Sequence, residues 1–446
     1  MPVSPARRLS YRVLRRVEHG TGFAADLLRA APEALSDADR HLATELVLGV
    51  IRRRAQLDDV IARLSGRRLS YFDPEIATIL RLAVYQVCFL ERIPKSAVVN
   101  EAVEMAKAAR KRSAAGLVNA VLRKCEPSSI AAASDAQVAR LAVPDWLRER
   151  WERHYGARAA PALASRTLET PPTILRVAGG DVARMREELA ASGIATRAAR
   201  HAPRALVVES GNVTRSEAWR AGRVLIQEEA SQLVGSLVKP HPGQRVLDLC
   251  AAPGMKSAGI AAELENGILV LCDRGEVRLR SMNIGRLIPA GVRWGALQLD
   301  AARPLPFGVL FDRILLDAPC SGTGTLGRNP EIKWRLQPED IARLAGAQAR
   351  MLRNALDALA PGGRLVYATC SLEPEENERV VEGALAGQRE FAALPRAQLS
   401  REWPHLAAMF DEQGYFRTRP DRDGTDGFFA AVIERRRQRV EHPLSS

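Results

Sequence analysis

Five short apolar runs after Pro242 constrain the fold of this chain more than any other feature. Each run ends near an acidic residue or a cysteine and precedes a stretch with helical spacing; the runs cover residues 245–249, 268–272, 294–299, 313–316 and 364–368. Unbroken apolar strands that alternate with helices predict a parallel sheet covered by helices on both faces. Ligands of such sheets bind at the carboxyl ends of the strands. Those ends carry Asp248, Asp273, Asp300, Asp317 and Cys370.

The turn after the first run consists of small residues, with the sequence DLCAAPGMK at residues 248–256. Such a turn lets a ligand approach the backbone and the start of the following helix. It matches neither the G-x-G-x-x-G turn of dinucleotide dehydrogenases nor the G-x-x-x-x-G-K-[ST] loop of P-loop NTPases. One acidic strand end alone is more often a helix cap. Three acidic strand ends in register beside this turn favour a ligand-binding site instead. Asp273 is placed to accept ribose hydroxyls, and Asp300 is placed to meet an adenine edge.

Two cysteines follow the fourth and fifth runs, in the segments DAPCSGTG (residues 317–324) and ATCS (residues 368–371). A lone cysteine in an α/β protein is most often a buried apolar residue. Two thiols that each lie just past a strand end, flanked by Gly, Ser or Thr, are poorly explained by packing. If the two strands are neighbours, Cys320 and Cys370 lie over the same cleft.

Two thiols and an aspartate beside an adenosyl-type cofactor suit methylation of a pyrimidine carbon. Carbon 5 of cytosine is a poor nucleophile, but addition of a thiolate at C6, with an acid near N3, makes C5 reactive toward a sulfonium methyl. A base must then remove the C5 proton. The attacking thiol needs activating surroundings, for which Lys256 and the helix start after Gly254 are candidates. The spacing leaves open which thiol attacks.

Apolar residues recur at helical spacing from Ala6 to about Lys124, with few glycines and no alternating strand pattern. This region predicts an all-α bundle of about six or seven helices. Helices should open at Ser36-Asp37 and Asp73-Pro74, and residues 93–96 should separate two of them.

The middle of the chain is more mixed. Residues 127–143 are typical of a linker. A helix at 146–155 and strands at 173–177 and 205–209 then indicate a small α/β subdomain that ends near Pro240.

Charge and cysteine content narrow the class of protein. The 446 residues include 65 Lys and Arg against 52 Asp and Glu, a net charge of +13, and residues 1–140 hold 23 of these bases and 15 of the acids. A basic region is often only a solvated surface, and nucleic acid is the functional alternative. Six cysteines without a C-x-x-C pair and seven histidines without an i, i+4 pair predict no disulfide framework and no metal site. No apolar stretch approaches the roughly 18 residues of a membrane span, so we expect a cytoplasmic protein that contacts no membrane.

On these motifs the chain resembles the RsmB/Sun (Fmu) family of bacterial ribosomal RNA cytosine-C5 methyltransferases, in the NOL1/NOP2/Sun group. The matching blocks are QEEAS at 227–231, DLCAAPGMK, DAPCSGTGTLGRNPEIKWR, YATCSLEPEENE and GTDGFFAA. The resemblance implies a multidomain chain: a NusB-like all-α RNA-binding domain at 1–140 and a linker with a small α/β RNA-binding subdomain at 141–240. A Rossmann-like class I S-adenosylmethionine methyltransferase domain at 241–436 and a tail at 437–446 would follow.

The resemblance also implies roles for individual residues. Cys370 would attack C6 of a cytosine in 16S rRNA, Cys320 would assist product release, and Asp317 would contact the base and close the cofactor pocket. S-adenosylmethionine would be held by Cys250, Ala251, Ala252, Pro253, Gly254, Met255 and Lys256, together with Asp273, Asp300 and Asp317. The partner would be 16S rRNA or a small-subunit precursor, bound by a monomer.

Two positions depart from the family pattern. Met255 stands where the family has its second glycine, and we expect its side chain to point away from the cofactor. Glu228 stands where the family often has Asp.

Two other functions are alternatives at this point. A non-catalytic NusB-like RNA-binding or ribosome assembly factor would need neither the thiol pair nor the acidic strand ends. A cysteine hydrolase would need a histidine beside a thiol, and none of the seven histidines lies in the motif blocks. An RNA substrate would have to present an unstacked cytosine. Contacts of the basic regions with flanking phosphates would make its affinity fall steeply with salt.

Overall fold

The computed structural model describes residues 3–31, 35–131, 134–282 and 284–437. The chain forms two compact units, residues 1–170 with 326–336 and residues 171–325 with 337–446. Apart from residue 437, the expected tail at 437–446 lies outside the described residues. Within these ranges, no helix has both the length and the apolar character that crossing a membrane requires.

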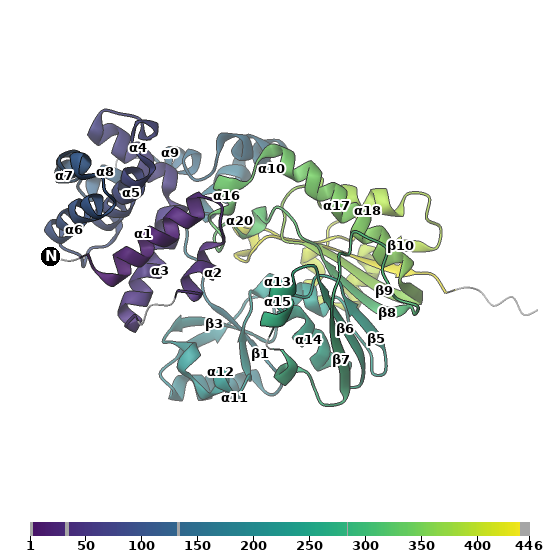
Figure 1. The fold of residues 1–446 in the computed structure, drawn as a ribbon. Helices are drawn as coiled ribbons and strands as arrows, with labels where there is room; N and C mark the ends of the chain where they lie inside the picture. Colours follow the sequence, from purple (N-terminus) through teal and green to yellow (C-terminus); the bar gives the residue numbers. More distant parts are fainter. Residues whose placement is uncertain (1–2, 32–34, 132–133, 283, 438–446) are drawn as a thin grey trace, which may run out of the picture. The chain divides into compact units, whose positions relative to one another are not determined.

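Among the described residues, seven α-helices form the N-terminal bundle of the first unit (Figure 1). They are α1 (Pro5–Glu18), α2 (Ala24–Arg29), α3 (Asp37–Arg52), α4 (Arg54–Ser65), α5 (Pro74–Phe89), α6 (Lys95–Ala108) and α7 (Ala115–Lys124), with 3-10 turns η1 (Leu69–Tyr71) and η2 (Arg112–Ala114). The predicted all-α bundle is confirmed. Ser36 caps α3 by accepting a hydrogen bond from Asp39 N. Helix α5 is buried from Ile76 to Val87 because its sequence is apolar nearly all round.

The first unit also contains the segment that follows the Cys320 block in the sequence. Residues 326–336 include α16 (Ile332–Arg335), whose Lys333 is fully buried. Its Nζ donates hydrogen bonds to Arg52 O at 2.9 Å, Ala142 O at 2.7 Å and Thr167 Oγ1 at 3.2 Å. The stretch expected to be a linker carries α8 (Ser128–Ala131) and α9 (Asp135–Arg140), and α10 (Asp145–Arg166) follows with a break at Gly156.

The second unit begins with a small antiparallel sheet of order β2-β3-β1-β4. Its elements are β1 (Ile174–Val177), α11 (Val182–Ala191), β2 (Ala195–Ala198), β3 (Ala205–Ser210), η3 (Val213–Arg215), α12 (Glu217–Arg220) and β4 (Val224–Ile226). The predicted small α/β subdomain is confirmed. The sequence indicated only β1 and β3, because β2 is exposed and β4 is three residues long.

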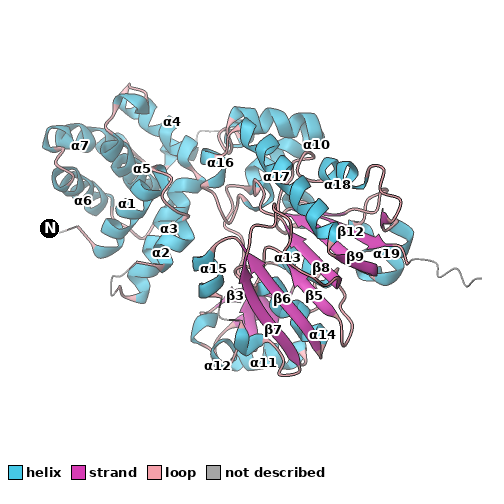
Figure 2. Cartoon of the chain, turned by 45° about the vertical axis from the view of Figure 1, so that its right-hand side comes forward, coloured by secondary structure: helices cyan, strands magenta, loops and turns pink. Residues whose placement is uncertain are grey.

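The large sheet of the second unit has the order β10-β12-β9-β8-β5-β6-β7, with β11 paired to β12. Its strands are β5 (Arg245–Asp248), β6 (Gly267–Asp273), β7 (Val292–Gln298), β8 (Phe311–Asp317), β9 (Leu359–Thr369), β10 (Phe391–Ala393), β11 (Phe416–Thr418) and β12 (Phe428–Arg435). Figure 2 shows β9, β8, β5, β6 and β7 side by side; these five are parallel and contain the predicted runs. The sheet is mixed rather than purely parallel, because β12 adds antiparallel beside β9. The segment between β11 and β12 is too short for the crossover helix of a parallel strand, so β12 fell outside the predicted pattern of strands that alternate with helices.

Helices cover both faces over most of the large sheet. Alternate side chains such as Val246 pack in one cluster with α13 (Glu229–Ser236) and α14 (Met255–Leu264), whereas Leu247 and its equivalents pack with α17 (Pro338–Asp357) and α18 (Glu378–Leu385). At β7 the expectation of two covered faces is wrong. This edge strand is exposed beyond Val292. The remaining elements are α15 (Glu276–Ser281), η4 (Gly285–Leu287), η5 (Thr323–Thr325), α19 (Arg396–Glu402), η6 (Pro404–Met409) and α20 (Pro420–Asp423).

Candidate active site

The two thiols meet at one edge of the large sheet. Strands β8 and β9 are parallel neighbours, with Asp317 opposite Ala368. Each strand runs into a cysteine-bearing loop, and Cys320 Sγ lies 3.3 Å from Cys370 Sγ. The condition that the sequence left open, that the two strands are adjacent, is therefore met.

The two thiols are not equivalent. Hydrogen bonding to the Cys370 sulfur, together with burial, raises the pKa of Cys320 well above its usual range. The raised pKa disfavours the thiolate form of Cys320, and the thiolate is the attacking form of a cysteine. Within the described part of the chain, no histidine is hydrogen-bonded to either sulfur, which disfavours a cysteine hydrolase.

A buried carboxylate joins the two cysteine loops. Glu376 is fully buried and accepts hydrogen bonds from Ser321 and Ser371, the residues that directly follow the two cysteines. Gln348 of α17 donates a further bond at 3.0 Å. Burial raises the pKa of Glu376, and the serine hydrogen bonds oppose that shift. Sequence reasoning missed this residue: several glutamates follow Cys370, and only the fold shows which of them accepts hydrogen bonds from both serines.

The loops around the thiols also pack at backbone distance. Gly324 N donates to Cys370 O at 2.9 Å, and Gly427 N donates to Gly324 O at 2.8 Å. A Cβ on Gly324 would lie 2.1 Å from the Gly427 carbonyl oxygen, so only glycine allows this approach. The GTDGFFAA block therefore supports the loop that carries Cys320.

Lys256 links the small-residue turn to the end of β8. Its Nζ lies 2.7 Å from Asp317 Oδ2 and 5.1 Å from the ring centroid of Phe428. Burial by itself would lower the pKa of Lys256, but the Asp317 carboxylate and the nearby Cys370 sulfur raise it, and the net shift is upward. Lys256 is thus a cation that is ion-paired with Asp317.

Two acidic strand ends leave carboxylate oxygens for a ligand. Asp273 is 1% exposed, and its Oδ1 accepts hydrogen bonds from Gly275 N at 2.8 Å and Arg278 Nη2 at 2.6 Å. Its Oδ2 has no hydrogen-bond partner among the residues that the structure describes. Asp300 lies just past β7 and accepts a bond from Ala302 N at 3.0 Å. Carboxylates held from one side, with the other oxygen available, suit ribose hydroxyls.

Asp248, unlike Asp273 and Asp300, is hydrogen-bonded within the protein interior. Its Oδ2 accepts a hydrogen bond from the Ser257 hydroxyl at 2.6 Å, which ties the end of β5 to α14. Burial raises the pKa of Asp248 to about 7, and the Ser257 bond only partly offsets that shift.

The turn between β5 and α14 needs glycine at one position. Gly254 has a φ of 97°, and a Cβ there would lie 2.5 Å from Ile284 Cγ2. Met255 is the first residue of α14 and packs against the apolar cluster that contains Ile284. Its carbonyl oxygen accepts a hydrogen bond from Arg176 Nη1 at 3.0 Å. Gly254, and not position 255, therefore has the left-handed conformation that favours glycine.

The QEEAS segment positions α13. Glu228 accepts hydrogen bonds from Ser231 N at 3.1 Å and Asp426 N at 3.0 Å, so it caps the helix and holds the GTDGFFAA block. Glu229 accepts a bond from Ala202 N at 2.8 Å, in a loop of the small sheet. Across the described ranges, no group of three or more His, Cys, Asp or Glu side chains is placed to hold a metal ion.

Known proteins match all three regions of the chain. The NusB family model matches residues 4–127, the ferredoxin-like domain of RsmF/B-like methyltransferases matches residues 143–214, and the 16S rRNA methyltransferase RsmB/F model matches residues 235–434. The probable ribosomal RNA small subunit methyltransferase B of Bacillus subtilis is 32% identical over 449 residues, which cover 98% of this chain and 100% of that protein.

Two further proteins that are similar to this chain are also methyltransferases by name. The ribosomal RNA small subunit methyltransferase B of Pseudomonas putida is 33% identical over 457 residues, covering 96% of this chain and 98% of that protein. The solved structure of a methyltransferase homolog protein from Pyrococcus horikoshii is 30% identical with a TM-score of 0.57, and the match covers 67% of this chain and 97% of that one.

The Rossmann-like sheet, the small-residue turn and the acidic strand ends define an S-adenosylmethionine-dependent methyltransferase. The match to full-length relatives then decides the family. The chain belongs to the 16S rRNA methyltransferase RsmB/F family, with a NusB-like domain before the catalytic fold.

Proposed function

We propose that this protein methylates C5 of a cytosine in 16S rRNA through a covalent bond between Cys370 and C6. The observation that carries the proposal is the thiol pair, with Cys320 and Cys370 sulfurs 3.3 Å apart and the Lys256–Asp317 ion pair nearby. Relatives named as small-subunit ribosomal RNA methyltransferases support RNA as the substrate class. A non-catalytic assembly factor would need no adjacent thiols.

The chain's own residues account for the steps at the base. Cys370 Sγ adds to C6 as a thiolate, and the electron pair of the C5–C6 double bond moves toward N3. N3 takes a proton from solvent and donates it in a hydrogen bond to the Asp317 carboxylate, which Lys256 orients; C5 is then nucleophilic, and N3 returns this proton to solvent when the product is released. Once Cys370 is bonded to C6, the Cys370 thiolate that raises the pKa of Cys320 is gone, and Cys320 can lose its proton to solvent. After C5 has gained its methyl group, the Cys320 thiolate removes the C5 proton. The C6–Sγ bond then breaks and Cys370 leaves as a thiolate.

The donor site fits S-adenosylmethionine, which when bound supplies an electrophilic methyl group on a sulfonium sulfur. The residues proposed to hold it are Cys250, Ala251, Ala252, Pro253, Gly254, Met255 and Lys256 of the turn, with Asp273, Asp300 and Asp317. The available Oδ2 of Asp273 supports this assignment, because the hydrogen bonds that this carboxylate accepts within the described residues go to Oδ1 and leave Oδ2 to accept one from a ribose hydroxyl.

The other regions are proposed to bind RNA around the target base. Residues 1–140 and 141–240 would contact flanking phosphates, and residues 241–436 would perform catalysis. The basic excess of residues 1–140 supports this division. We further propose that the protein acts as a monomer in the cytoplasm on 16S rRNA or a small-subunit precursor.

Methyl transfer from labelled S-adenosylmethionine to unmodified 16S rRNA, followed by mass-spectrometric mapping, tests the proposal. We expect 5-methylcytosine at one position, no product with Cys370→Ala, and a covalent protein–RNA adduct on denaturing gels with Cys320→Ala. Cys88→Ala, in the helical bundle, is the control and should behave as the unmodified protein. Full activity of Cys370→Ala would overturn the nucleophile assignment, and calorimetry without S-adenosylmethionine binding would revive the non-catalytic alternative.

A further inference from the structure

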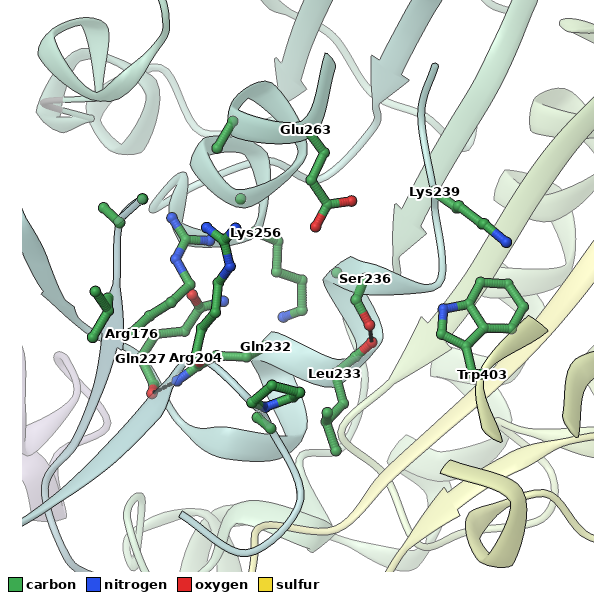
Figure 3. Close-up of a pocket in the computed structure, with 18 of the residues that line it drawn as sticks. Arg176, Arg204, Gln227, Gln232, Leu233, Ser236, Lys239, Lys256, Glu263 and Trp403 are labelled. Atoms are coloured by element: carbon green, nitrogen blue, oxygen red, sulfur yellow. Dashed lines mark hydrogen bonds between the residues drawn. The ribbon is translucent and has the colours of Figure 1, made fainter. Parts of the chain in front are cut away.

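A cavity of about 290 Å³ lies within the second unit, between the small sheet and helices α13 and α14. Its size is close to the lower end of small-ligand sites, about 300–1,000 Å³. Arg176 of β1, Arg204, Gln227 and Lys256 are among the side chains that line it. In Figure 3 the guanidinium groups of Arg176 and Arg204 lie together on one side of this cavity.

Arg176 is a buried cation without a matching carboxylate. It is only 8% exposed, and its single hydrogen bond in the described chain goes to Met255 O, a neutral acceptor. The pKa of Arg176 is lowered to about 10, mainly by burial and then by the nearby Arg204, and Glu263 only partly opposes this shift. Two guanidinium groups thus face one carboxylate, and burial of an unbalanced charge is costly unless an anion compensates it.

The Arg176 guanidinium also fits into a space beside Gly259 of α14. A Cβ on Gly259 of α14 would lie 2.2 Å from Arg176 Nη1, so the guanidinium occupies space that only a glycine leaves open. The bond to Met255 O fixes it from another direction. A planar group fixed in this way presents its remaining donors in one orientation, as bidentate phosphate recognition requires.

A second polar atom of the cavity lacks a partner. Gln227 is 5% exposed, and its Oε1 is buried without a hydrogen bond among the described residues. A carbonyl oxygen in that state needs a donor. A ribose 2′-hydroxyl is such a donor, and in RNA it lies one short linkage away from a phosphate.

We propose that this cavity binds a ribose-phosphate unit of the substrate RNA, with Arg176 and Arg204 on the phosphate and Gln227 on the ribose. The RNA source rests on the proposed function. The position of the cavity supports RNA as the ligand, because Lys256 lines the cavity and its Nζ contacts Asp317. The bound unit is therefore one lysine side chain away from the reacting groups, and it anchors RNA next to the target base.

Filter binding of 16S rRNA at several salt concentrations tests the site with three variants. Arg204→Gln removes an exposed charge, Gly259→Ala displaces the Arg176 guanidinium without changing charge, and Arg389→Gln is the control at an exposed arginine away from the cavity. We expect Arg204→Gln and Gly259→Ala to weaken RNA binding about tenfold, and Arg204→Gln to reduce the salt slope by about 1, as loss of one phosphate contact does. Calorimetry should show unchanged S-adenosylmethionine affinity for Arg204→Gln.

The inference is wrong if Arg204→Gln and Gly259→Ala bind RNA as tightly as Arg389→Gln does. A melting temperature raised by inorganic phosphate in the unmodified protein but not in Arg204→Gln, with RNA binding unaffected, would assign the cavity to a free phosphate compound and overturn the RNA source. Methyl transfer by the unmodified protein is measured separately. If transfer occurs while the variants bind RNA normally, this inference fails and the proposed function stands.

Discussion

The Glu376 carboxylate accepts hydrogen bonds from both the backbone amide and the hydroxyl of Ser321. The same carboxylate accepts a bond from the Ser371 hydroxyl at 2.5 Å. Since each serine directly follows one cysteine, a single buried group keeps the Cys320 and Cys370 loops together. The 3.3 Å separation of the sulfurs therefore depends on a residue that touches neither of them.

Glu376→Gln should lower kcat about tenfold or more. The amide nitrogen cannot accept a hydrogen bond, so one pair of buried donors would lose its acceptor, at a cost of about 1–3 kcal/mol. The pair is either the Ser321 and Ser371 hydroxyls or Ser321 N with Gln348 Nε2. Steady-state kinetics with labelled donor measure the effect, and S-adenosylmethionine affinity by calorimetry should not change. Glu382→Gln, at an exposed position on α18, is the control. A kcat equal to that of the control would show that Glu376 does not position the thiols.

Asp248 should make stability depend on pH. Its pKa is raised from 3.8 to about 7 in the folded protein, so the folded state holds the proton more tightly than the unfolded state does. Its contribution is therefore fully present below about pH 4 and is lost as the pH rises toward 7. Melting temperatures of the unmodified protein and Asp248→Asn, compared from pH 5 to 7.5, should shift in favour of the variant as the pH increases. Asp357→Asn, which changes an exposed carboxylate, should show no such trend.

Asp273→Asn should weaken S-adenosylmethionine binding by about 10- to 100-fold. The change removes a charged acceptor at the end of β6, and a hydrogen bond to a charged group contributes about 1.5–3 kcal/mol. Isothermal titration calorimetry measures the affinity directly. The neighbouring Glu276→Gln removes the same charge from an exposed position on α15 and should leave the affinity unchanged. Equal affinities for the two variants would contradict the assignment of Asp273 to the donor site.

Lys333→Met should destabilise the helical unit. The buried Lys333 Nζ donates to two backbone carbonyls and one hydroxyl, and the thioether leaves those acceptors without a donor. We expect a loss of about 2–5 kcal/mol, seen as a lower melting temperature. Lys124→Met, at an exposed position on α7, controls for the loss of one positive charge. A melting temperature within about one degree of the control would contradict this role for Lys333.

The sequence by itself determined the class of the fold and most of the reactive groups. Apolar periodicity marks the bundle helices and the five parallel strands because each pattern depends on neighbours a few residues away. The acidic strand ends and Cys370 can be predicted in the same way, because each lies just after a predicted strand and parallel strands place their carboxyl ends on one edge of the sheet.

Only the tertiary structure decided what depends on pairing between distant segments. It placed β8 next to β9, which brings Cys320 to Cys370, and it added β12 antiparallel to a sheet expected to be parallel. It buried Glu376 between the two loops and packed residues 326–336 into the helical unit. It also left Arg176 buried without a carboxylate partner within the described residues. Burial and strand order come from contacts between segments far apart in the chain, and a glutamate or arginine has the same local pattern whether it is solvated or enclosed.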